Sequence, residues 1–242
     1  MNLSDHSVSA GEKPAAAHTL TAVLWDMDGT LVDSEPYWLA AERDLVEAAG
    51  ATWNPEILPH MIGSALMRSA NLLREWFALD LEPQVIVDTL IDGVLDRMAR
   101  DGVPWRPGAR ELLLALGEAG VPCALVTMSW QRMVDVVLEQ LPEGAFGAVV
   151  TGDRVARGKP HPEPYLTAAD ELGVDIARAV AIEDSLPGLA SAEASGARVL
   201  AVEAHVPLPA APGRSRLTTL AGVGVADLDA IAGGAVVDVV GA

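Results

Sequence analysis

The stretch Val23-Leu24-Trp25-Asp26-Met27-Asp28-Gly29-Thr30-Leu31-Val32-Asp33-Ser34 decides the fold expected for this chain. It begins as a short apolar run, typical of a buried strand, and the run ends in two carboxylates. Because side chains alternate along a strand, Asp26 and Asp28 can both reach one pocket while Met27 points into the core. Gly29 permits the sharp turn that follows. Ligand sites of open α/β sheets lie at such strand ends, so the stretch predicts a site there.

Two carboxylates this close together repel each other unless a cation or a shared proton relieves them. A hard divalent cation with oxygen ligands is the natural solution, and Mg²⁺ is the commonest one. The sequence therefore predicts a Mg²⁺ cofactor. The alternative is a plain turn after a strand, since Asp-x-Asp pairs are common, and the rest of the chain has to decide.

The composition limits the classes of function. The chain has 242 residues, half of them hydrophobic, which is enough for one large domain or for a core domain with a smaller partner. A net charge of −18 argues against nucleic acid and anionic membranes as partners. The single cysteine, Cys123, lies in an apolar run and is expected to be a small buried hydrophobe, which fits a cytoplasmic protein.

The two ends of the chain give weaker signals. Residues 1–18 are polar, lack the apolar core of a signal peptide and are expected to be a disordered tail. No apolar stretch is long enough to span a bilayer. Residues 207–242 carry several prolines and read as a terminal decoration whose role the sequence does not indicate.

Residues 34–105 carry helical signals alone. Ser34 is expected to cap a helix that has Glu35 and Pro36 in its first turn and continues over 37–49. One or two amphipathic helices are expected over 61–77, and another over 85–98. A segment of this length is too long for a simple crossover. It predicts a small all-helical domain inserted into a core that is built from residues 19–33 and 106–242.

Asp33 and Arg106 stand next to the two junctions between this insert and the core. They are expected to lie near hinges. The alternative is that both are ordinary polar residues of surface loops.

Buried-strand patterns return after the insert, over residues 121–126, 148–150, 179–182 and 198–202, and helical patterns separate them over 109–119, 165–172 and 186–196. Alternation of strands and helices is typical of a parallel sheet with helices on both faces. The fold class predicted is therefore α/β, a Rossmann-like doubly wound parallel sheet with an inserted helical domain.

Polar side chains follow two of these strands. Thr127 follows strand 121–126, where a hydroxyl and the amides of a helix N-terminus can bind a phosphate oxygen, and Ser129 is expected to cap the next helix. Glu183 and Asp184 follow strand 179–182, so a second strand ends in acids. Because parallel strands end at one edge of a sheet, we expect these side chains near Asp26.

Lys159 stands between a glycine and a proline. The chain has two lysines against fourteen arginines, so a lysine kept in such a place is a candidate for a specific role. A compact ammonium can lie between a carboxylate and a phosphate, where a planar guanidinium fits poorly. The alternative is an ordinary surface lysine. His161 nearby is interpreted as a loop residue.

Four strings occur in a fixed order: D-M-D-G-T-L-V-D-S, a threonine after a hydrophobic strand, G-K-P, and I-E-D-S-L-P-G. Together they resemble the four motifs of the haloacid dehalogenase (HAD) superfamily, whose members mostly hydrolyse phosphate esters. The resemblance covers roughly residues 20–202. It implies a HAD core with a helical cap over residues 34–105 that closes on the site.

The resemblance also implies roles. Asp26 would be the nucleophile that forms an aspartyl-phosphate, and Asp28 would be the general acid and base. Catalytic or substrate-binding roles would fall to Thr127 and Lys159, with Met128 and Gly29 beside the substrate. Mg²⁺ would be held by Asp26, the backbone carbonyl of Asp28 and Asp184, with Glu183 as a nearer or outer ligand.

Several branches of the family share the helical cap. Asp28 sets the dehalogenases aside, because they lack this second acid. The β-phosphoglucomutases carry a cap histidine near the position of Trp38 and a cap arginine near Leu66, and both are missing here. The string D-S-E-P-x-W is similar to hexose- and hexitol-phosphate phosphatases. The alternative is that Tyr37 and Trp38 are aromatics of the cap core.

The function expected is hydrolysis of a small phosphate monoester, a sugar or polyol phosphate. A phosphosugar mutase and a non-catalytic binding protein of the same fold are the alternatives. A small-molecule ester is the expected partner, and a monomer or weak homodimer is the expected assembly.

Overall fold

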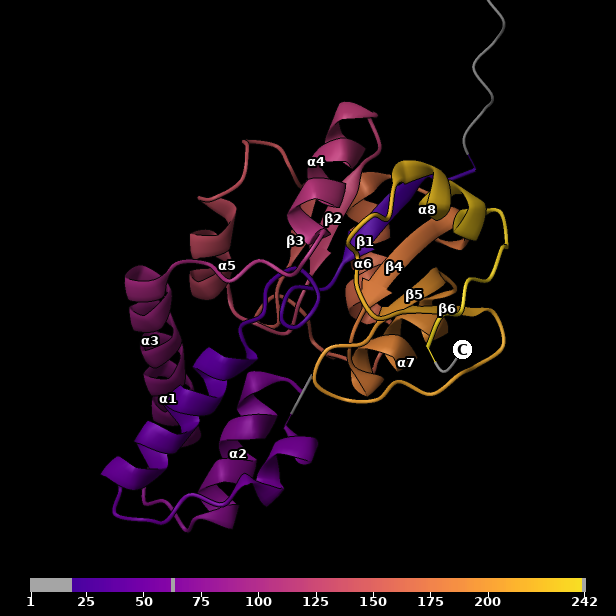
Figure 1. The fold of residues 1–242 in the computed structure, drawn as a ribbon. Coiled ribbons are helices and arrows are strands. Elements are labelled where there is room, and N and C mark those ends of the chain that lie inside the picture. Colours follow the sequence, from indigo (N-terminus) through magenta and orange to yellow (C-terminus); the bar gives the residue numbers. More distant parts are fainter. Residues whose placement is uncertain (1–18, 62–63, 241–242) are drawn as a thin grey trace, which may run out of the picture.

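The computed structural model describes residues 19–61 and 64–240, and the expected disordered tail, residues 1–18, lies outside them. The described part is a layered α/β structure with a group of helices beside the sheet (Figure 1). In this part no helix combines the length and the apolar composition that a membrane crossing needs.

Six parallel strands form the sheet in the order β3-β2-β1-β4-β5-β6. They are β1 (Ala22–Trp25), β2 (Cys123–Val126), β3 (Ala148–Val150), β4 (Ala179–Glu183), β5 (Arg198–Val202) and β6 (Arg214–Leu217). In the register, Trp25 of β1 lies between Leu125 of β2 and Ile182 of β4, so that the residues after all three strands meet at one edge.

Burial on both faces explains the continuous apolar runs of the central strands. Val23 and Trp25 contribute to one core cluster and Ala22 and Leu24 to the other. Side chains of α4 (Ala109–Glu118), α5 (Gln131–Leu138) and α8 (Val225–Ala232) belong to the first cluster. Those of α6 (Glu163–Leu172) and α7 (Leu186–Ser195) belong to the second. The predicted doubly wound sheet is confirmed.

The chain between β1 and α4 is helical. It contains α1 (Glu35–Ala48), the short 3₁₀ helix η1 (Pro55–His60), α2 (Leu66–Trp76) and α3 (Pro83–Asp101), and α3 packs against α1 and α2. We call residues 34–105 the helical insert. Figure 1 shows it as a group beside the sheet rather than as a layer upon it.

The two connections of the helical insert lie side by side. Val32 and Trp105 form an antiparallel bridge, and the Asp33 N–H donates to the Pro104 carbonyl over 2.6 Å. Asp33 also contacts His205 Nε2 at 2.7 Å, and the Arg106 guanidinium donates to the Glu203 carbonyl over 3.0 Å. Both residues predicted near the junctions therefore hold the loop after β5.

The C-terminal segment belongs to the core, through an edge strand and a helix that the sequence analysis did not predict. β6 has the sequence Arg-Ser-Arg-Leu, which shows no apolar run. Arg214 is buried because its guanidinium binds Glu193 of α7 over 2.6 and 2.8 Å. Cys123 is a buried free thiol, as expected.

Candidate active site

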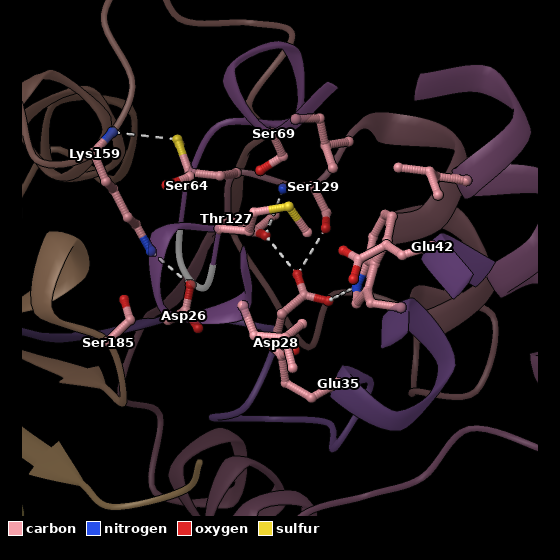
Figure 2. A pocket seen from close by; sticks show the side chains of 16 residues that line it. Asp26, Asp28, Glu35, Glu42, Ser64, Ser69, Thr127, Ser129, Lys159 and Ser185 are labelled. Carbon is pink, nitrogen blue, oxygen red and sulfur yellow. Dashed lines mark hydrogen bonds and ion pairs between the residues drawn. The ribbon is translucent and has the colours of Figure 1, made fainter. Parts of the chain in front are cut away.

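A buried ammonium lies between two carboxylates at the edge of the sheet. Lys159 Nζ donates to Asp26 Oδ1 over 2.6 Å (Figure 2), and also to Glu183 Oε1 over 2.5 Å and to the Val126 carbonyl over 2.9 Å. Burial alone would lower the pKa of Lys159, but the charges of Asp26 and Glu183 outweigh burial and raise it. The ammonium therefore stays charged, and all three of its hydrogens have acceptors.

Glu183 is anchored at the start of α7. Its Oε1 also accepts from Tyr165 Oη over 2.7 Å, and its Oε2 accepts from the Asp184 N–H over 3.1 Å and from Ser185 Oγ over 3.2 Å. Gly188 makes room for this carboxylate, since a Cβ there would lie 2.0 Å from it. Tyr165 was not predicted as a site residue, because its sequence context indicates only an amphipathic helix.

Three buried acids form a cluster beside this ammonium. Carboxylate oxygens of Asp26, Glu183 and Asp184 all lie within 4.8 Å of one another. Burial and then the charge of Glu183 raise the pKa of Asp26 to about 8, although Lys159 acts in the opposite direction. Burial and the charge of Asp26 also raise the pKa of Asp184 well above its ordinary value. A hard divalent cation would relieve this repulsion, so the donor set fits Mg²⁺.

Gly29 and Thr30 shape this cluster. Thr30 Oγ1 donates to Asp184 Oδ1 over 3.2 Å. Gly29 has φ +89°, and a Cβ on it would lie 2.0 Å from Asp184 Oδ2. The Gly29 N–H donates to the Val32 carbonyl over 2.7 Å and closes a turn. The missing side chain of Gly29 leaves room for the Asp184 carboxylate.

The Asp28 side chain is held by four donors. Ser34 Oγ and Trp38 Nε1 donate to its Oδ1 over 2.5 and 3.1 Å. Thr127 Oγ1 and Ser129 Oγ donate to its Oδ2 over 3.2 and 2.7 Å (Figure 2). Thr127 and Ser129 follow β2, whereas Ser34 and Trp38 belong to the helical insert. The two parts of the chain together fix both oxygens of Asp28.

Two of these donors were predicted to have another role. Ser34 and Ser129 were expected to cap helices, and this was wrong. Ser34 occupies the N-cap of α1 but makes no capping bond, and Trp130 is the N-cap residue of α5. Both hydroxyls bind the Asp28 carboxylate instead, because a charged acceptor forms the stronger hydrogen bond.

The two neighbouring aromatics of α1, Tyr37 and Trp38, have different roles. Trp38 is buried in the core cluster and also reaches Asp28. Tyr37 packs at the edge of the same cluster, and its hydroxyl donates to the Gly102 carbonyl over 3.3 Å. Trp38 therefore belongs to both the core and the site, whereas Tyr37 is an aromatic of the helical insert.

One pocket joins the strand ends to the helical insert. Its lining from the sheet side includes five of the predicted residues: Asp26, Asp28, Thr127, Met128 and Lys159. Met128 also turns its sulfur to the Lys159 N–H at 3.2 Å. Asp184 and Glu183 belong to the acidic cluster. Gly29 packs closely against Asp184. The predicted site residues therefore lie together.

Two acids of the helical insert also line the pocket, and the sequence analysis missed them. Burial and then the charge of Asp28 raise the pKa of Glu35 to about 7. Burial and then the charge of Glu35 raise the pKa of Glu42 to about 8. Their spacing of seven residues, which places both on one face of a helix, was the available signal.

Comparisons with known proteins agree with this geometry. The family model of haloacid dehalogenase-like hydrolases matches residues 20–196. Hexitol phosphatase B of Escherichia coli K12 is 31% identical over 191 residues, which cover 76% of this chain and 84% of that protein.

Solved structures give the same result for the fold. A crystal structure of CbbY from Rhodobacter sphaeroides in complex with phosphate has a TM-score of 0.77 at 26% identity, covering 87% of this chain and 99% of that one. A β-phosphoglucomutase from Clostridium difficile has a TM-score of 0.77 at 17% identity, over 88% of this chain and 97% of that one, and shares the fold. The sequence motifs, the sheet and the family model agree, and the chain belongs to the haloacid dehalogenase-like hydrolases.

Proposed function

We propose that this chain is a Mg²⁺-dependent phosphatase that hydrolyses a small sugar or polyol phosphate through an aspartyl-phosphate. The observation that carries the proposal is the pairing of Asp26 with Lys159 at the floor of a pocket that Asp28 also lines. A nucleophile, a fixed ammonium and an acid–base group then face one space. The resemblance to hexitol phosphatase B supports the substrate class.

Asp26 and Asp28 divide the chemistry. Lys159 binds Oδ1 of Asp26, which leaves Oδ2 to attack phosphorus as the bond between phosphorus and the ester oxygen breaks. Asp28 gives its proton to the leaving oxygen and then takes a proton from the water that attacks the aspartyl-phosphate. The four donors around Asp28 hold it in place for both transfers.

Asp26, the backbone carbonyl of Asp28 and Asp184 would hold Mg²⁺, whose charge, when the ion is bound, neutralises the phosphate. Glu183 stands close to this set, but its oxygens accept from Lys159, Tyr165 and Ser185. We therefore assign Glu183 to the outer position, where it orients Lys159. Thr127, Met128 and Lys159 would contact phosphate oxygens, and the positive charge of Lys159 offsets the acidic surface of the chain.

The helical insert would act as a cap on a core made of residues 19–33 and 106–242. Its Trp38 and Glu42 line the pocket together with residues of the strand ends. The isolated bridge between Val32 and Trp105 places the two connections side by side, which is the geometry a hinge requires. Closure would exclude water from the aspartyl-phosphate until hydrolysis.

The two alternatives have less support. A mutase has to bind a second phosphate, but no cationic side chain from the described part of the insert lines the pocket. A protein that only binds its ligand has no need of the catalytic and metal-binding acids, yet Asp26, Asp28 and Asp184 are all present. A cytoplasmic location, a monomer or weak homodimer, and the absence of nucleic-acid and membrane partners stay predictions.

Phosphate release from p-nitrophenyl phosphate, with and without Mg²⁺, tests the proposal. We expect turnover that depends on the metal and that Asp26→Asn abolishes. Asp80→Asn, at an exposed aspartate of the helical insert, is the matched control and should behave as wild type. A panel of sugar and polyol phosphates follows. Normal Mg²⁺-dependent turnover by Asp26→Asn would contradict the proposed nucleophile.

A further inference from the structure

We infer that Glu42 selects the substrate. Its carboxylate binds hydroxyl groups at the end of the substrate remote from the phosphate, and in its ionised form it excludes substrates that carry a second anionic group there. The inference rests on the proposed function, because it concerns the same pocket, and it narrows the substrate class to phosphomonoesters with an uncharged polyhydroxyl end.

The placement of Glu42 is the first observation. The residue lies on α1 and is 7% exposed, yet it lines the same pocket as Asp26 and Asp28. In the part of the chain that the structure describes, no hydrogen bond or ion pair reaches its carboxylate. A buried carboxylate without a partner is costly, so its place in the pocket indicates a ligand that donates hydrogen bonds to it.

The charges around the pocket are the second observation. Glu35 and Glu42 are the charged groups that the described part of the insert adds to the lining. Lys159 is the cation on the sheet side, and Asp26, Glu183 and the Val126 carbonyl take its three hydrogens. A second phosphate or a carboxylate near Glu42 would therefore meet like charge without a compensating cation.

The neighbouring hydroxyls distinguish a polyol from an amine. Ser64 and Ser69 of the helical insert line the same pocket as Glu42 (Figure 2). A substrate hydroxyl can donate to Glu42 and also accept from a serine, whereas an ammonium only donates. A carboxylate has two oxygens and can accept from two adjacent hydroxyls. Sugar and polyol chains present such pairs of hydroxyls, so they complement Glu42 and the two serines of this lining.

A pair of substrates that differ at one end tests the inference. Sorbitol 6-phosphate ends in a hydroxyl where 6-phosphogluconate ends in a carboxylate. At about pH 9, where Glu42 with its pKa of about 8 is mostly ionised, we expect wild type to favour the first by about a hundredfold in kcat/KM. Glu42→Gln keeps the shape and removes the charge, and this ratio should fall below about tenfold. Glu47→Gln, at an exposed glutamate of α1, is the matched control and should keep the wild-type ratio.

A ratio of two substrates for one variant cancels any loss of folded enzyme. Equal use of the two substrates by wild type would overturn the inference, and so would an unchanged ratio in Glu42→Gln. A strong preference for glucosamine 6-phosphate over glucose 6-phosphate that Glu42→Gln abolishes would overturn it in favour of an amine.

The proposed function fails separately, by the absence of phosphate release from every ester. In that case calorimetric titration of the same two esters onto wild type and Glu42→Gln, each carrying Asp26→Asn, measures the selection as a ratio of Kd values. Equal Kd values for the two esters in the protein with Glu42 intact would overturn the inference.

Discussion

The indole N–H of Trp38 donates to Oδ1 of Asp28 over 3.1 Å, and this bond joins α1 of the helical insert to the chain after β1. Asp28 is the proposed acid–base group. Its position therefore depends on the position of the helical insert, so that closing the pocket and orienting the acid become one event. A histidine is expected near this place in the mutases, and here an indole, which donates but never accepts a proton, takes it.

Trp38→Phe keeps the ring and removes the donor. Because a hydrogen bond to a charged group contributes about 1.5–3 kcal/mol, we expect kcat to fall about tenfold or more and Tm to fall by several degrees. Trp53→Phe is the control, since Trp53 stacks on Phe77 at 5.5 Å and does not line the pocket. Equal losses of kcat in the two variants would show that Trp38 acts only through packing.

The buried ion pairs of Lys159 give a second prediction. Lys159→Met leaves Asp26 and Glu183 without their common partner, and removing one member of a buried ion pair typically costs about 3–5 kcal/mol. We expect a large fall in Tm and loss of turnover. Adding Glu183→Gln removes one of the stranded charges, so the double variant should regain part of the Tm.

Turnover should stay absent in the double variant, because Asp26 still lacks the ammonium. Thermal unfolding monitored by circular dichroism measures Tm, and phosphate release measures turnover. A double variant that is less stable than Lys159→Met would contradict the assignment of Glu183 as the partner that Lys159 neutralises.

The fold was predictable where hydrophobic burial determines the local pattern. The strands over 148–150 and 198–202 have the predicted bounds, because their apolar residues are largely buried, although β3 is an edge strand and β5 begins at the exposed Arg198. β6 was missed because an edge strand needs fewer apolar side chains, and Arg214 is buried by an ion pair with α7 that no local pattern reveals.

The site was predictable where short strings carry the chemistry. Asp26, Asp28, Thr127 and Lys159 follow strands or stand in distinctive loops, and they line one pocket. Contacts between distant segments were not predictable. Tyr165 meets Glu183 only because α6 packs on the sheet, and the two serines were misinterpreted because a hydroxyl before a helix looks like a cap.

Substitution of two glycines that have similar φ angles distinguishes backbone strain from steric crowding. Gly29 has φ +89° and Gly50 has φ +81°, but a Cβ at Gly29 would lie 2.0 Å from Asp184 Oδ2, whereas nothing lies within 4 Å of one at Gly50. We expect Gly50→Ala to lose about 1 kcal/mol of stability and to keep its activity. Gly29→Ala should displace Asp184 and lose turnover.

The concentration of Mg²⁺ that gives half-maximal phosphate release is the measurement for this pair. It should rise in Gly29→Ala, if any activity is left, and stay at the wild-type value in Gly50→Ala. An unchanged metal requirement in an active Gly29→Ala would contradict the placing of Asp184 among the metal ligands.

Glu42 makes the stability of the free protein depend on pH. Burial and the charge of Glu35 raise its pKa from 4.5 to about 8 in the folded state. Below pH 4.5 Glu42 is protonated in both the folded and the unfolded chain. As pH rises toward 8 only the unfolded chain loses this proton, so the stability of the folded state decreases across that window.

Glu42→Gln removes this dependence, since an amide does not titrate. We expect the variant to be more stable than wild type by on the order of a few kcal/mol at pH 8.5, or roughly 5–10 °C in Tm, with a much smaller difference at pH 5. Glu47→Gln, at an exposed position of α1, should match wild type at both pH values. A Tm difference that is the same at both pH values would contradict the raised pKa. A gain in stability together with weaker selection among substrates would show that this carboxylate is kept for binding at a cost to folding.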